Sequence, residues 1–176
     1  MKFLIPEKIE TDRLILRTFQ DDDWADLHQL YSDPESIKYT IQQPLTEAES
    51  WRTMAGMVGH WQLLGYGPYA VEVKTTGQVL GPVGLWYPLG WPEPEIKWAI
   101  SRHYWGHGYA SEAARAVKKM ARLNVPKLSL ISLIFIGNER SVNLALALGA
   151  QLERQLEFRG SEAQIFRHSL ACPMGR

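Results

Sequence analysis

The sequence has one cysteine, no excess of either charge and no long apolar run. Because Cys172 is the only cysteine, no disulfide can form within the chain and no group of thiolates can bind zinc. We expect Cys172 to be a free thiol near the C-terminus rather than a nucleophile. The 19 basic residues balance the 19 acidic ones. Net charge therefore gives no reason to expect nucleic acid as a partner.

Long apolar segments are absent as well. The longest run, Leu128–Ile136, is far shorter than the ~20 residues that cross a bilayer, and two serines interrupt it. The first residues lack the apolar region and the cleavage site of a secretory signal. These absences predict a cytoplasmic protein with no membrane partner. A hydrophobic content of 45% in 176 residues is enough for one core, so we expect a single domain over residues 1–176.

Hydrophobic periodicity predicts a mixture of strands and helices. Alternating or continuous apolar runs predict strands at residues 14–19, 69–73, 79–87, 95–100, 128–136, 151–159 and 163–169. Apolar positions three and four apart predict helices at residues 21–31, 46–65, 108–122 and 138–148. The capping box of Thr46 and Glu49 favours the start of the second helix, and the three aspartates at 21–23 favour an N-cap for the first. The strand at 128–136 is expected to be buried on both faces, beside the strand at 95–100.

One turn carries the strongest functional pattern. The strand at 95–100 leads into a segment with Gly106 and Gly108 one residue apart, and that segment opens an amphipathic helix. The unpaired amides and the dipole of a helix N-terminus favour an anion such as a phosphate, which glycines let approach closely. Ser111 would add a hydroxyl donor, and no acidic residue lies between Arg102 and Ser111. Glycine spacing alone fits a plain strand-to-helix turn equally well.

Other sites that use such patterns fit the context less well. A dinucleotide fingerprint would follow the first strand of a parallel unit, with an acidic residue ~20 positions further on. This turn follows antiparallel strands, and residues 127–130 hold no carboxylate. Neither a G-x-x-x-x-G-K-[ST] loop nor a G-x-S-x-G elbow occurs. His103 and His107 are four apart, but Gly106 lies between them and no His-Glu pair opens the motif, so we expect no metal site.

Three stretches together resemble a known family. They are Thr11–Arg17, the pair formed by Glu95–Ile100 and Tyr104–Ala113, and Asn138–Ser141 with Leu148-Gly149. In these stretches the chain resembles the GCN5-related N-acetyltransferases (GNAT), in particular the branch of ribosomal-protein and peptide alpha-amino acetyltransferases. The middle stretch is the specific one, because it matches the family's acetyl-CoA motif. The resemblance implies a layered α/β (α+β) fold, with a mixed, mostly antiparallel sheet of six to seven strands flanked by about four helices.

The resemblance also implies acetyl-CoA as co-substrate and a set of binding positions. Those for the pyrophosphate are Gly106, His107, Gly108, Tyr109, Ala110 and Ser111. The pantetheine arm would lie between the strands at 95–100 and 128–136. A backbone N–H near Ala99 or Ile100 would polarise the thioester carbonyl. Asn138 and Ser141 match positions that contact the cofactor or the reacting sulfur in relatives.

The implied reaction is direct attack of a primary amine on the thioester. The amine must be neutral, and a carboxylate or a positioned water could take its proton. Glu93 and Glu95 are the candidate bases, and solvated charges at a hairpin end are the alternative. Many relatives have a tyrosine as acid where this chain has Ala145, so Ser141 or solvent would protonate the leaving thiolate. Lys97 replaces a glycine that is usual in this branch, so the resemblance does not define the acceptor side of the cleft.

The acceptor and some alternatives remain undecided by sequence. A peptide N-terminus, a metabolite or an antibiotic would fit as acceptor, and a homodimer stays open. The rival hypothesis, suggested by Ala145, is a non-catalytic CoA-binding or protein-interaction module, and a third uses a longer acyl-CoA. Among the tryptophans, Trp24, Trp51 and Trp61 lie on apolar helix faces and predict core positions. Those near the expected cleft are Trp86, Trp91 and Trp105.

Overall fold

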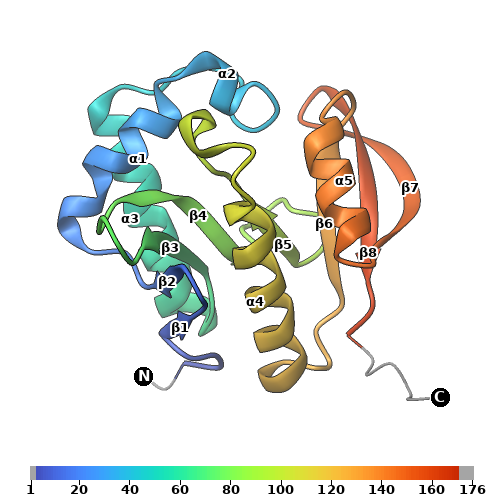
Figure 1. Cartoon of the computed structure of the whole chain (residues 1–176). Helices are drawn as coiled ribbons and strands as arrows, with labels where there is room; N and C mark the ends of the chain where they lie inside the picture. Colours follow the sequence, from blue (N-terminus) through green and yellow to red (C-terminus); the bar gives the residue numbers. More distant parts are fainter. Residues whose placement is uncertain (1–2, 171–176) are drawn as a thin grey trace.

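One eight-stranded sheet runs through residues 3–170, which are the residues described by our computed structural model (Figure 1). The strands are β1 (Lys8–Glu10), β2 (Leu14–Arg17), β3 (Pro68–Val73), β4 (Val79–Trp86), β5 (Glu95–Trp98), β6 (Leu130–Phe135), β7 (Gln151–Phe158) and β8 (Ser161–His168). Their spatial order is β1-β2-β3-β4-β5-β6-β8-β7. All neighbouring pairs are antiparallel except β5 and β6, which are parallel. Cys172 lies outside the described residues.

Helices cover both faces of this sheet. They are α1 (Trp24–Tyr31), α2 (Pro34–Ile37), α3 (Glu47–Leu64), α4 (Tyr109–Asn124) and α5 (Glu139–Ala147), with short 3-10 turns η1 (Asp21–Asp23) and η2 (Arg102–Tyr104). The apolar faces of α1 and α3 pack together against Ala70 and Val79, whereas α4 packs on the opposite face against Val71 and Leu80. In Figure 1, α4 crosses the middle of the sheet and α5 stands beside β6 and β8. None of the helices described here is long and apolar enough to cross a membrane.

The layered α/β (α+β) expectation is confirmed, with eight strands where the sequence indicated six to seven. All the strands and helices expected from periodicity are present within a few residues of the expected bounds. Strand β6 is largely buried and lies beside β5, as its continuous apolar run predicts. Two elements were not expected, β1 and α2. With three and four residues, they are too short to display a period.

Two local expectations were wrong in instructive ways. Asp23 does not cap α1 with its side chain. Its buried carboxylate instead accepts hydrogen bonds from both terminal nitrogens of Arg17, at 2.7 and 2.9 Å. Trp51 is not a core residue, because 46% of it is exposed on the outer side of α3. Trp61, ten residues later on the same helix, is 2% exposed and is a core residue as expected, while Trp24 is partly buried.

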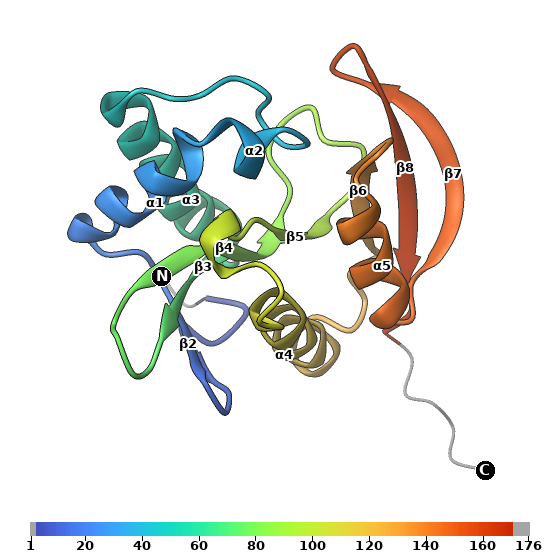
Figure 2. The same ribbon diagram turned by 45° about the horizontal axis from the view of Figure 1, so that its top comes forward.

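The pairing between β5 and β6 is very short. Glu95 opposite Ile131 is the only paired position, and the Ile131 N–H donates to the Pro94 carbonyl at 3.0 Å. One step further along, the strands are joined by a side chain, since the Ser132 hydroxyl donates to the Ile96 carbonyl at 2.8 Å. Beyond these contacts the two strands separate and leave the sheet open on the side of α2 and α5 (Figure 2).

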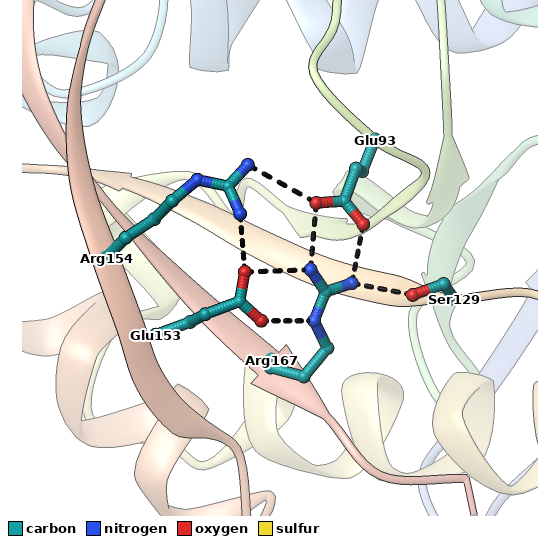
Figure 3. A network of polar contacts seen from close by, with 5 residues as sticks. All are labelled: Glu93, Ser129, Glu153, Arg154 and Arg167. Carbon is teal, nitrogen blue, oxygen red and sulfur yellow. Dashed lines mark hydrogen bonds and ion pairs between the residues drawn. The ribbon is translucent and has the colours of Figure 1, made fainter.

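A network of charged side chains holds the two halves of the sheet together beside this short pairing (Figure 3). Arg167 of β8 donates two hydrogen bonds to Glu93, just before β5, at 2.6 and 2.8 Å, and two to Glu153 of β7. Arg154 of β7 contacts both carboxylates, and Ser129 accepts a further hydrogen bond from Arg167. Because two nitrogens of Arg167 bond to each carboxylate, these contacts fix the relative orientation of the side chains as well as pairing their charges. We infer that the network fixes where β5 and β6 begin to separate.

Gly81 in β4 lies very close to the backbone that follows β5. Its φ is +145°, and a Cβ at this position would lie 2.0 Å from the Ala99 carbonyl oxygen. We expect Gly81→Ala to reduce the free energy of unfolding by ~3 kcal/mol or more, measured by urea denaturation. Gly77→Ala is the control, because Gly77 also has a positive φ (+72°) but nothing within 4 Å of a Cβ. It should lose only ~1 kcal/mol. Equal losses would show that backbone conformation, not the close approach to Ala99, makes glycine necessary.

Candidate active site

A cavity of about 300 Å³ opens where β5 and β6 separate. Its walls come from α1, the segment after α2, α3, the β4–β5 connection, β5, β6, the start of α5 and the β7–β8 turn. The residues that line the cavity include Tyr39, Trp86, Trp91, Glu95, Lys97, Trp98, Ala99, Ser132, Leu133, Asn138, Ser141, Phe158 and Arg159. A concave site of this size with few polar groups suits a small ligand.

Glu95 supplies a carboxylate to the cavity wall. It is 6% exposed, and its two oxygens accept hydrogen bonds from the Trp91 indole N–H at 3.0 Å and from the Leu133 amide at 3.2 Å. Burial raises the pKa of Glu95, and the neighbouring Lys97 ammonium and these two donors oppose the rise. Burial lowers the pKa of Lys97. Shifted pKa values of paired acidic and basic groups are common at sites where proton transfer occurs.

The opposite wall is formed by the start of α5. Asn138 is the N-cap of this helix, and its side-chain oxygen accepts a hydrogen bond from the Ser141 amide at 3.3 Å. The Ser141 hydroxyl accepts one from the Trp98 indole N–H at 3.0 Å. Both sequence-predicted residues thus lie in the lining, held in place by the helix cap and by β5. Ala145 lies one turn further on, is fully buried with Ile134, and takes no part in the cavity.

The amides of β5 alternate between two directions. Ala99 N–H donates to the Pro82 carbonyl at 2.9 Å and Ser101 N–H to the Leu80 carbonyl at 3.0 Å, both across to β4. In extended backbone the direction of the amides alternates, so the N–H of Ile100, which lies between these two, is expected to point away from β4. The Ala99 amide is already bonded within the sheet, which favours Ile100 over Ala99 as the predicted oxyanion donor. The assignment itself stays a prediction.

The glycine turn lies at the far end of β5, at the start of α4. Gly106 and Gly108 have φ values of +80° and +78°, which glycine adopts without strain. Gly108 is the N-cap of α4, and no side chain in the described part of the chain caps the helix through a hydrogen bond. The amides of the first helical residues, Tyr109, Ala110 and Ser111, therefore point outward without an intrahelical partner. A Cβ at Gly106 would meet nothing within 4 Å, so the space beside the turn is open.

Arg13 ties the beginning of the chain to this turn. Its guanidinium donates to the His107 carbonyl at 2.9 Å and to Glu112 of α4 at 2.7 Å, and it lies 4.5 Å from the centre of the Tyr109 ring. On the other side, Arg140 of α5 lies 3.9 Å from the centre of the Trp105 ring. Sequence reasoning missed both arginines because neither belongs to the glycine motif. The signal that could have found Arg13 is its position in the first matched stretch.

Among the residues predicted for the cleft, Glu93, Ile100 and Trp105 lie outside the cavity lining. Glu93 points into the charged network of Figure 3, where hydrogen bonds from Arg167 lower its pKa. An ionised carboxylate held by two arginines is a poor base, so this geometry does not favour Glu93. Trp105 donates its indole N–H to the Ile100 carbonyl at 2.7 Å and supports the turn rather than the cavity, whereas Trp86 and Trp91 do line it. Within residues 3–170 no three His, Cys, Asp or Glu side chains are grouped to hold a metal.

Comparison with known proteins identifies the family and the fold. Residues 13–151 match the model of the acetyltransferase (GNAT) domain, a range that contains the β5–β6 gap and the glycine turn. The chain belongs to the GNAT acetyltransferase family. It is 34% identical over 111 residues to the uncharacterized N-acetyltransferase p20 of Bacillus licheniformis, in a match that spans 62% of each chain. Less than two thirds of that relative's length is therefore covered.

Solved structures agree with this GNAT assignment over nearly the whole chain. An acetyltransferase from Agrobacterium tumefaciens str. C58 superimposes with a TM-score of 0.80 at 26% identity, covering 96% of both chains. RimL, a ribosomal L7/L12 alpha-N-protein acetyltransferase solved in complex with coenzyme A, has a TM-score of 0.73 at 17% identity, covering 94% of this chain and 97% of that one. At that identity RimL shows the shared fold alone. The sequence-based resemblance to this family is confirmed.

His168 and Ser132 form a buried pair in the sheet of this GNAT domain. The Ser132 hydroxyl gives its proton to Ile96, so it accepts one from His168 Nε2 at 2.9 Å. The other ring nitrogen, Nδ1, is buried and has no hydrogen-bond partner among residues 3–170. Burial, with smaller contributions from Lys118 and Arg167, lowers the pKa of His168 to about 4. The histidine is thus neutral in the folded protein over most of the physiological range.

This lowered pKa predicts a loss of stability in acid. Below the unfolded-state pKa of ~6.5 the unfolded chain binds one more proton than the folded chain, so stability falls by ~1.4 kcal/mol per pH unit until about pH 4. The total is ~3 kcal/mol. In His168→Gln, whose amide can still donate to Ser132, the acid slope measured by urea denaturation should decrease. His103→Gln, at an exposed histidine, is the control and should keep the wild-type slope. An unchanged slope in His168→Gln would refute this assignment.

Proposed function

We propose that this protein is an acetyl-CoA-dependent N-acetyltransferase that transfers an acetyl group to a primary amine. The observation that carries the proposal is the cavity at the β5–β6 gap. One wall holds the buried carboxylate of Glu95 and the other the hydroxyl of Ser141, and we assign the oxyanion donor to the amide of Ile100, just after β5. Base, proton source and oxyanion donor are the three groups that acyl transfer to an amine can use.

The residues present suit acetyl-CoA. The uncapped start of α4 offers backbone amides and an open surface beside Gly106, which fits a pyrophosphate. Arg140, which forms no ion pair within the described residues, adds a positive charge next to Trp105 in the same turn. The open gap between β5 and β6 leads from this turn toward the cavity, which suits an extended arm. We propose Gly106, His107, Gly108, Tyr109, Ala110 and Ser111 as the pyrophosphate site, with Asn138 beside the arm.

Three groups of the chain have distinct roles in the proposed acetyl transfer. Acetyl-CoA supplies an activated thioester carbonyl. Glu95 removes the proton from the acceptor ammonium, and burial, which raises its pKa, makes the carboxylate a stronger base. The Ile100 N–H is placed to stabilise negative charge on the carbonyl oxygen. Ser141, or solvent beside it, returns a proton to the departing sulfur, since the position of Ala145 is buried in apolar packing.

The alternatives from the sequence become outcomes of the tests below. A non-catalytic CoA-binding module would bind acetyl-CoA without turning over any amine. A preference for a longer acyl group would appear as a higher rate with that acyl-CoA. The cytoplasmic location, the single domain over residues 1–176 and the oligomeric state stay predictions from the sequence.

Thermal unfolding with acetyl-CoA, CoA and NAD tests the cofactor site. At 100 times the dissociation constant a ligand stabilises by ~2.7 kcal/mol, which is about 5–10 °C for a chain of this size. We expect a shift of that order with both CoA species and none with NAD. Gly106→Glu, which places a carboxylate where the pyrophosphate would lie, should abolish the shift.

Gly160→Glu is the matched control for that variant. Gly160 in the β7–β8 turn has nearly the same φ (+74° against +80°), and a Cβ there also meets nothing within 4 Å. It carries the same backbone cost and the same charge but lies far from the start of α4 along the sheet, so its ligand shift should equal that of wild type. No shift with either CoA species in wild type would overturn the acetyl-CoA site, and with it the proposed reaction.

Glu95→Gln tests the base. We expect kcat to fall by ~10²–10⁴-fold with any acceptor, and the rise of kcat/KM with pH that follows Glu95 deprotonation to disappear. Glu93→Gln is the comparison, since Glu93 is a carboxylate two residues away that lies outside the cavity lining. A larger loss of rate in Glu93→Gln, at equal thermal stability of the two variants, would assign the base to Glu93 instead.

A further inference from the structure

The cavity contains two cations that no carboxylate neutralises by contact. Lys97 comes from β5 and Arg159 from the turn between β7 and β8, and both belong to the lining. Neither forms an ion pair with any residue between 3 and 170, whereas Arg154 and Arg167 of the neighbouring strands β7 and β8 both do. We propose that Lys97 and Arg159 bind a carboxylate of the acceptor, so that the acceptor is a small amine bearing a carboxylate, such as an amino acid.

Aromatic rings hold the two cations in place. The Lys97 ammonium lies 4.9 Å from the centre of the Trp86 ring, and the Arg159 guanidinium lies 4.3 Å from that of Trp91. Trp86 and Trp91 contact each other edge to face, with centres 6.2 Å apart. The two cations therefore lie over adjacent aromatic rings, and the cation–π contacts restrict the positions of both side chains without neutralising their charges.

The position of Arg159 depends on an unusual backbone. Arg159 has a φ of +53° and Gly160 one of +74°, the pattern of a tight type I′ hairpin turn. A non-glycine residue with a positive φ is uncommon, and here it places the guanidinium over Trp91 and Phe158. This turn brings a charge from the far edge of the sheet to the cavity that β5 lines.

The charges in the cavity do not balance without a ligand. Burial lowers the pKa of Lys97, the Glu95 carboxylate opposes this, and Arg159 is close enough to lower the Lys97 pKa further. The one carboxylate in the lining, Glu95, directs its oxygens to Trp91 and Leu133 instead. With all three ionised the lining carries one excess positive charge. A single carboxylate on the acceptor would remove this excess, and Glu95 would be left to take the proton from the amine.

This arrangement favours a free amino acid over a peptide N-terminus. In a peptide, the group one carbon from the amine is a neutral amide, which offers no charge to a lysine or an arginine. A volume of about 300 Å³ with the rings of Trp86, Trp91 and Phe158 along it suits one small, partly apolar molecule. The inference rests on the proposed acetyl transfer and names the class of acceptor for it.

A simpler role for Lys97 makes a different prediction. If Lys97 only balanced the charge of Glu95, its removal would raise the pKa of that base and slow the reaction with every acceptor equally. If it binds the acceptor's carboxylate, its removal affects only acceptors that have one. Selectivity between two matched acceptors therefore separates the two roles.

The experiment compares kcat/KM for amino acids with that for their amides, by thiol release from acetyl-CoA. Phenylalanine and phenylalaninamide, and leucine and leucinamide, have the same side chain and differ in the carboxylate. The carboxylate also raises the pKa of the amine, so the preference is compared between variants at one pH. We expect wild type to prefer the carboxylate form by at least ~10-fold, mainly through KM, and Lys97→Met to lose most of this preference. Lys97→Arg should retain part of it. Arg159→Gln, at the exposed rim, should lose less than Lys97→Met.

Lys38→Met is the matched control. Lys38 also lies over an aromatic ring beside the cavity, that of Tyr39, but it is exposed and outside the lining, so its variant should show wild-type selectivity. Acetylation of amides, peptides or simple alkylamines with no preference for a carboxylate would overturn the inference and leave the proposed transfer intact. A preference that Lys97→Met preserves would also overturn it. Acetyl-CoA binding without transfer to any amine would refute the proposed transfer itself.

Discussion

The structure depends on two parallel strands that pair at one position and then separate. In a continuous sheet the amides and carbonyls of β5 beyond Ile96 would bond to β6, and no space would exist between them. Because the strands separate, the side chains of Glu95 and Lys97 line a cavity instead of contacting a second strand. The glycine turn at the end of β5 and the cap of α5 after β6 then lie on either side of the same gap.

A sheet interrupted in this way needs other contacts to keep its halves in register. Ser132 joins β6 to Ile96 by a side chain where backbone pairing ends, and His168 holds the Ser132 hydroxyl from β8. Arg167 and the two glutamates of Figure 3 connect the segment before β5 with β7 and β8. Most of these groups are partly buried, so removing one partner leaves the other unsatisfied. Glu93, Glu153 and Arg167 lie far apart in the sequence but are joined in one network of hydrogen bonds in the sheet.

Much of the site could be foreseen from local pattern. The glycine turn, Asn138 as a helix cap and Glu95 at the start of a strand all lie in short segments whose conformation is set by neighbouring residues. Other features depend on partners far away in sequence. Arg13 meets Glu112 about a hundred residues later, Arg159 reaches Trp91 from another hairpin, and Glu93 is occupied by Arg167. A single sequence contains no period or spacing that would predict such pairs, so Glu93 and Glu95 were equivalent until the fold was known.

The amino-acid order alone specifies where strands and helices begin, which faces they bury, and that a strand leads through a glycine turn into a helix in mid-chain. Periodicity, caps and glycines act over a few residues, and that information is fully present in the linear chain. Which amide of β5 remains available, which glutamate faces the cavity and which cations stay without a carboxylate are properties of the assembled sheet. They arise because burial and hydrogen bonding are decided between elements that are distant in sequence, and the same side chain gains or loses a function according to which partner it meets there.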